Sequence, residues 1–209
     1  NRDNNRIKSP SSQPPTVRRA GFLALFTGLS VGAIVSGMNA FRDLMVNSID
    51  NNFSWQIIIV PLIYFIILTR FIIGNLIHII TIEQGVSKKI WITDILFLIT
   101  EYILFIFLGA LIYKLTNIFF IFLFVILSLD MIWSLSLSRL RKTPIKILFR
   151  WAIINLATIV ILLPLFIYNN ISQLSNDQFL LSSLIIFIVS RSLATLGMTS
   201  VGDRLTRRP

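Results

Sequence analysis

The chain has 209 residues, of which 55% are hydrophobic and only 13% are charged, and its mean hydropathy is +0.81. This composition excludes an ordinary soluble domain, whose surface must carry many polar and charged side chains. The chain contains no cysteine and one histidine, which excludes disulfides, thiolate–metal sites and a His-rich metal centre, so we expect neither a metal nor a cofactor.

Six apolar segments predict an all-α, polytopic membrane helix bundle. Residues 1–19 form a basic tail rich in Pro and Ser, in which no apolar period appears. Each apolar segment is long enough to cross a hydrocarbon core of about 30 Å at 1.5 Å per residue. The membrane domain, residues 20–199, is therefore predicted to be followed by a basic C-terminus at 200–209. The predicted spans are 20–41, 55–81, 91–113, 117–138, 148–168 and 179–199.

The positions of the basic residues predict the orientation of the chain. If the N-terminus is cytoplasmic, 15 of the 19 Lys and Arg residues fall on the cytoplasmic side and two on the outside. This asymmetry is typical of membrane proteins and predicts both termini in the cytoplasm. The net charge of +10 is then explained by contact with anionic lipid head groups, without nucleic acid. We expect a bacterial inner membrane, with an organellar membrane as the alternative.

Small residues form one face of the first predicted span. Ala24, Gly28, Gly32 and Ser36 recur every four residues, and Ala40 continues the stripe. Such a stripe lets another helix approach closely. Two interpretations stay open: packing within the chain, or contact with a second copy or another membrane subunit.

Ionisable and polar side chains interrupt the later spans. A charge at the bilayer centre costs about 2.5–3.5 kcal/mol on insertion scales, so such residues are usually paired inside a bundle and are functional candidates. Counted from the cytoplasmic end of each span, every basic residue has an acidic residue at its level. The expected pairs are Arg70 with Glu101, Asp130 with Arg191, and His78 with Asp94. The candidate cluster comprises Arg70, Asn75, His78, Asp94, Glu101, Asp130 and Arg191.

A short pattern in this region resembles a set of small polytopic bacterial membrane proteins of unassigned activity. The pattern is Arg70-Phe71-x-x-Gly74-Asn75-x-x-His78, followed by an acidic helix and by Asp130-x-x-Trp133. The resemblance covers roughly residues 60–135 and implies no activity. The chain also matches six-span lysosomal-type potassium channels in size and span number, but its first span lacks their Phe-Ser-x-x-x-Asp motif.

Two functions remain for a chain with these features. The first is a non-enzymatic membrane subunit that assembles into an oligomeric ion-conducting or signal-sensing assembly through its charged cluster. The second is an accessory structural subunit of a larger membrane complex, in which the charges are packing ion pairs. We expect no enzyme and no catalytic residues, because the nucleotide-binding, hydrolase and metalloprotease motifs are absent from the sequence.

Overall fold

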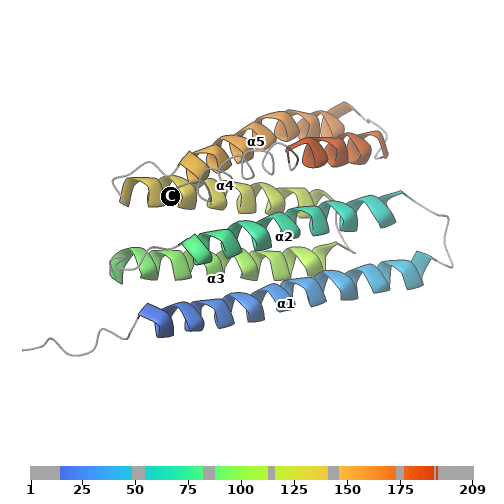
Figure 1. The fold of residues 1–209 in the computed structure, drawn as a ribbon. Coiled ribbons are helices and arrows are strands. Elements are labelled where there is room, and N and C mark those ends of the chain that lie inside the picture. Colours follow the sequence, from blue (N-terminus) through green and yellow to red (C-terminus); the bar gives the residue numbers. More distant parts are fainter. Residues whose placement is uncertain are drawn as a thin grey trace, which may run out of the picture.

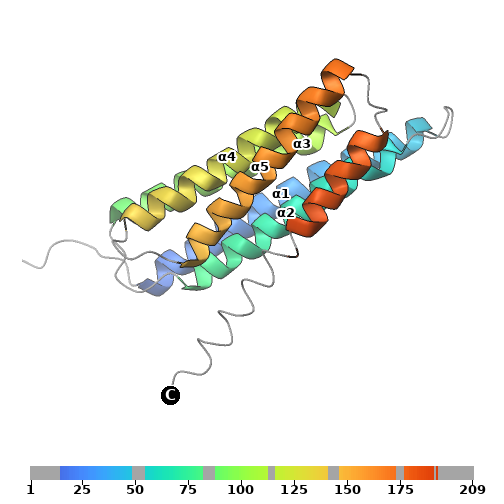
Figure 2. The ribbon, with the colours of Figure 1, turned by 90° about the horizontal axis from the view of Figure 1, so that it is seen from above.

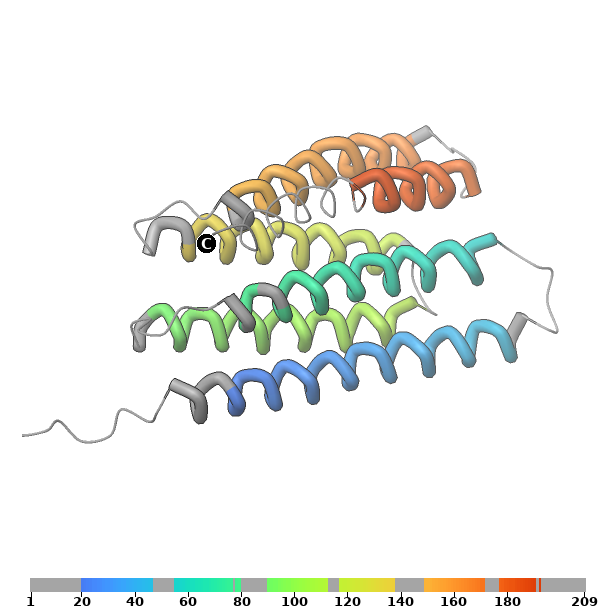
Figure 3. Tube along the Cα trace, viewed as in Figure 1, coloured from blue at the N-terminus to red at the C-terminus, as the bar shows by residue number. Residues whose placement is uncertain are grey.

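The computed structural model describes residues 15–48, 55–81, 88–112, 116–140, 146–172, 177–190 and 192, and all of these are helical except for the turn residues 55 and 112. Successive helices run in alternating directions (Figures 1 and 3). Five helices are long and apolar enough to cross a membrane, which indicates an integral membrane protein. The bounds are α1 Pro15–Ser48, α2 Gln56–Thr81, α3 Lys88–Leu111, α4 Thr116–Leu140 and α5 Lys146–Ser172, with a shorter apolar helix at Asp177–Ser190.

The helix ends agree with the predicted spans within a few residues, except for α1, which extends beyond the predicted span 20–41 at both ends and reaches Ser48. That helix begins at Pro15, so residues 15–19, which we expected in the tail, are helical. Proline suits the first turn of a helix, because the N–H that it lacks would have no partner there. The sixth predicted span is described only over Asp177–Ser190 and residue 192, and residues 1–14 and 193–209 lie outside the described part.

Helix α2 is the most buried of the long helices. It is buried over 61% of its apolar window, against 28% for both α1 and α5. Helix α1 packs against α2 and α3, α3 packs against α4, and α4 packs against α5 (Figure 2). The predicted spans 91–113 and 117–138 leave only a short connection between them, which requires antiparallel neighbours, and α3 and α4 do pack against each other. Polar residues on α2 are therefore enclosed by the bundle.

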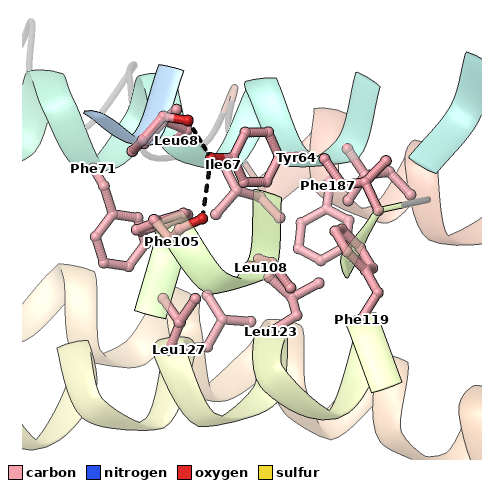
Figure 4. Packing of buried hydrophobic residues seen from close by; sticks show 14 of the residues in the cluster. Tyr64, Ile67, Leu68, Phe71, Phe105, Leu108, Phe119, Leu123, Leu127 and Phe187 are labelled. Atoms are coloured by element: carbon pink, nitrogen blue, oxygen red, sulfur yellow. Dashed lines mark hydrogen bonds between the residues drawn. The ribbon is translucent and has the colours of Figure 1, made fainter. Parts of the chain in front are cut away.

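An apolar core fills the centre of the bundle and extends toward the end at which α2 and α4 begin. Figure 4 shows Phe105 and Leu108 of α3 between side chains of α2 and α4. Near the far end, the Phe179 ring lies 4.7 Å from that of Phe120, measured between centroids, so the helix Asp177–Ser190 packs against α4. We call the other end, at which α1, α3 and α5 begin, the basic end.

The close contact between α1 and α3 explains part of the small-residue stripe. Ser36 Oγ donates a 2.7 Å hydrogen bond to the carbonyl oxygen of Ile106. A Cβ at Gly109 would lie 2.8 Å from Ser36 Oγ and 2.9 Å from the backbone nitrogen of Gly37, so the two backbones approach too closely for a larger side chain. Gly109 and Gly37, which the sequence did not single out, are thus the residues that set the helix spacing.

The rest of the predicted packing face behaves differently. Gly32 meets the end of the Ile106 side chain, but Ala24 and Gly28 are exposed and nothing lies within 4 Å of a Cβ built at Gly28. Of the two interpretations of the stripe, packing within the chain therefore does not account for Ala24 and Gly28. The physical reason is that the buried face of α1 passes through other residues there, namely Phe22, Phe26 and Ser30.

Candidate functional site: a buried polar cluster

Buried polar side chains from all five long helices gather in the bundle. Helix α2, the most enclosed helix, supplies three of them, and Arg70, Glu101 and Asp130 lie close to the midpoints of their helices. Their side chains are almost inaccessible, with Glu101 exposed over 1% of its surface. The buried polar residues in this region are Ser30, Arg70, Asn75, His78, Asp94, Glu101, Asp130, Ser134, Asn155 and Thr158.

A small cavity lies at the centre of this group. Its volume is about 10 Å³, and it is lined by Arg70, Phe71, Asn75, Asp130 and Trp151. Three residues of α2 thus face one residue of α4 and one of α5. The lining residues carry a guanidinium, a carboxyl, an amide and an indole, and the fifth residue, Phe71, is apolar.

Asp130 is held from two sides. Asn155 on α5 donates a hydrogen bond from Nδ2 to Asp130 Oδ2, and the charge of Arg70 acts on Asp130 across the cavity. A buried carboxylate requires such partners, because removing its charge from water is costly. Asp130 therefore links α2, α4 and α5.

Glu101 has a different environment. The charge of Asp130, a second acid, acts on Glu101, and the Asn75 side chain is close enough to interact with the Glu101 carboxyl group. Asn75 also lies within interaction range of the Tyr102 hydroxyl. Among the described residues, Glu101 Oε1 and Asn75 Nδ2 make no hydrogen bond of normal geometry. We refer to Arg70, Asn75, Glu101, Asp130 and Asn155 as the central cluster.

A second polar network lies closer to the basic end. His78 Nε2 lies 3.2 Å from Asp94 Oδ2, and Trp133 Nε1 donates a 3.3 Å hydrogen bond to Asp94 Oδ1. The His78 and Trp133 rings pack edge to face, with centroids 4.9 Å apart. Asp94 is exposed over only 2% of its surface. We call this arrangement the His78 network; it links α2, α3 and α4.

The structure supports one of the three predicted pairs. The expected contact between His78 and Asp94 is confirmed. The charge of Arg70 acts on Asp130, a neighbour that helix depth alone did not assign to it, because depth does not show which neighbouring helix a side chain faces. The predicted pairing of Arg70 with Glu101 stays a prediction. Arg191 lies outside the described residues, so its predicted pairing with Asp130 stays a prediction.

Trp151 and Gly74 are site residues whose roles the sequence did not reveal. Trp151 is only 6% exposed and lines the cavity. A Cβ at Gly74 would overlap its indole ring, so glycine at that position is what allows the tryptophan to reach α2. The sequence did contain a weak indication that Trp151 belongs to the site, because Trp151 and Asn155 are four residues apart and share one face of α5.

The residues of the Arg70–His78 pattern, together with Glu101, Asp130 and Trp133, all belong to these two polar groups or contact them. No family model matches the chain, and no curated protein or solved structure does. Within the described residues, no three His, Cys, Asp or Glu side chains are grouped so as to hold a metal ion. The side chains gathered at the site carry carboxyl, guanidinium, amide, imidazole and indole groups.

Proposed function

We propose that this protein is a six-span membrane protein, with both termini in the cytoplasm, that conducts or senses an ion through its central cluster. It performs no enzymatic reaction in this proposal. The observation that carries the proposal is the position of Glu101, a buried acid whose electrostatic neighbour is another acid, Asp130.

The balance of charge argues for a mobile ion. In the described part of the two polar groups, three carboxyl groups (Asp94, Glu101 and Asp130) accompany one guanidinium and one imidazole. Structural ion pairs would instead be expected to match each buried charge with an opposite one, because an unmatched charge in a membrane is costly. A proton or small cation that binds at Glu101 and Asp130 supplies the missing positive charge.

The side chains around the central cluster favour entry of such an ion from one end of the bundle and block it at the other. Polar side chains continue from the central cluster toward the basic end, through the His78 network. On the opposite side, the described core is closed by apolar side chains such as Leu108, Phe119 and Leu123 (Figure 4). An ion would thus enter from the basic end and cross the apolar layer only when the helices separate there.

Flux through liposomes tests the proposal. The full chain, reconstituted alone, should pass an ion, and Glu101→Gln should lower the flux by about tenfold or more, because it removes one negative charge in a low-dielectric site. The matched control is Asp43→Asn, an equivalent loss of charge at an exposed residue that contacts its neighbour Arg42. Equal flux in wild type and Glu101→Gln, or no flux of any ion, would reject the proposal.

The topology has its own test. Since the natural chain contains no cysteine, single cysteines report their side of the membrane without background. Cysteines at Ser12 and Ser87 should react with a membrane-impermeant maleimide only from the cytoplasmic side, and one at Asn51 only from the other side. The reverse pattern would show that the orientation is inverted.

A purely structural role is the second candidate, and the His78 network favours it. There, one carboxylate meets an imidazole and an indole N–H, so three helices are fixed to one another without an excess of acid. An accessory subunit held together in this way would pass no ion, and Glu101→Gln would change only its stability.

Assembly with further copies or with other membrane subunits is part of the proposal. Its support is the exposed pair Ala24 and Gly28, small residues that would let a neighbouring helix approach α1 closely. The native mass after mild detergent extraction tests it: a small integer multiple of 23.9 kDa indicates a homo-oligomer, and co-purifying chains indicate a larger complex. A lone monomer would contradict both.

A further inference from the structure

The size and lining of the cavity beside Asp130 indicate which ion the central cluster carries. We infer that the cavity binds one water molecule and that the central cluster passes protons and not metal cations. The inference rests on the function proposed above and names the species that this site carries.

The size of the cavity is the first argument. Its volume of about 10 Å³ is at the lower limit for one water molecule. A cation that kept its hydration shell would need several times this space. A proton needs none, because it travels as part of the water molecule.

The chemistry of the lining is the second argument. A bare cation must replace its water with several oxygen ligands. The polar lining instead offers the Arg70 guanidinium, which repels a cation, the Asp130 carboxyl, the Asn75 amide and the Trp151 indole. An anion is disfavoured by Asp130 and by Glu101 close by. Water, which both donates and accepts hydrogen bonds, matches this mixture.

Unused hydrogen-bonding atoms point to the same ligand. Trp151 Nε1 and Asn75 Nδ2 are buried donors that make no hydrogen bond within the described residues, and both residues line the cavity. Buried water typically makes about three hydrogen bonds to such groups. A water molecule between them would accept from these donors and donate to Asp130.

The proton step at this site balances simply. A hydronium ion outside the cavity, on the side of the basic end, passes a proton to the cavity water as that water passes another proton to the Asp130 carboxylate, so one O–H bond breaks and one forms in each transfer. The products are a neutral water molecule and a neutral carboxylic acid. The reverse transfer returns the proton, and exchange with Glu101 moves it toward α3.

Ion selectivity in liposomes tests whether the protein passes protons or metal cations. Wild-type protein is placed in liposomes that contain either a pH-sensitive dye or a dye for sodium or potassium, each under the corresponding gradient. We expect proton flux without sodium or potassium flux. Comparable sodium or potassium flux would overturn this inference but leave the proposed function intact, whereas no flux of any ion would overturn both.

Trp151→Phe tests the role of the cavity. The substitution keeps a ring against Gly74 but removes the N–H donor, and it should lower proton flux about tenfold. Trp55→Phe is the matched control, because Trp55 is an exposed residue just before α2 and its substitution should leave the flux unchanged. If Trp151→Phe does not fold, Asn75→Leu removes the other donor. Undiminished proton flux in a folded variant would overturn the assignment of water to this cavity.

Discussion

Gly74 and Trp151 lie so close together that no other residue fits at position 74 without moving the indole. A Cβ at Gly74 would approach Cζ2 and Cζ3 of Trp151 to 2.9 Å and the tip of the ring more closely still. The ring is rigid and lines the cavity with Asp130, so this contact between α2 and α5 also fixes the shape of the site.

Gly74→Ala should therefore destabilise the protein by about 1–3 kcal/mol, the usual cost of overpacking a buried contact. Thermal unfolding in detergent measures the change. Gly21→Ala is the matched control: nothing lies near a Cβ there, so this change should be neutral or slightly stabilising. Equal effects at the two glycines would contradict the proposed contact with Trp151.

Arg70→Met should cost about 3–5 kcal/mol, because it leaves the buried Asp130 without its cationic neighbour. The double variant with Asp130→Asn should recover much of that loss, whereas the double variant with Glu101→Gln should recover less. Unfolding free energies of the single and double variants form two double-mutant cycles. If the coupling is larger with Glu101, Arg70 pairs with that residue and the geometry described above is wrong.

Asp94→Ala should destabilise by roughly 2–4 kcal/mol, since it leaves both the His78 ring and the Trp133 N–H buried without their acceptor. Trp133→Phe removes only one of the two interactions and should cost less. Chemical denaturation in mixed micelles provides the measurement. Additive effects of Asp94→Ala and Trp133→Phe would show that the two residues do not interact.

Tyr64→Phe tests a contact that joins three helices. The Tyr64 hydroxyl lies 2.7 Å from the carbonyl oxygen of Ala33 on α1 and 3.1 Å from that of Phe105 on α3 (Figure 4). Loss of this buried hydroxyl should cost about 1–2 kcal/mol. Tyr168→Phe, at a tyrosine that is 55% exposed, should change stability by less than about 0.5 kcal/mol. A similar midpoint of unfolding for both variants would argue against the contact.

Much of the architecture follows from the sequence because it depends on composition along the chain. Long apolar runs separated by short polar connections predict membrane-length helices, and the backbone in a bilayer has few other ways to satisfy its hydrogen bonds. The same logic predicted that α3 and α4 are neighbours, since only a short connection joins them. It also selected Arg70, His78, Glu101 and Asp130, because charges in apolar runs are rare and costly.

Only the tertiary structure decided which of these residues meet. Depth along a helix can be counted from the sequence, and it correctly matched His78 with Asp94. The side of a helix that faces each neighbour depends on packing of the whole bundle, and packing brought Arg70 to Asp130 and left Glu101 beside a second acid. Trp151 shows the same limit, because its burial requires Gly74 on a distant segment to leave room for its ring.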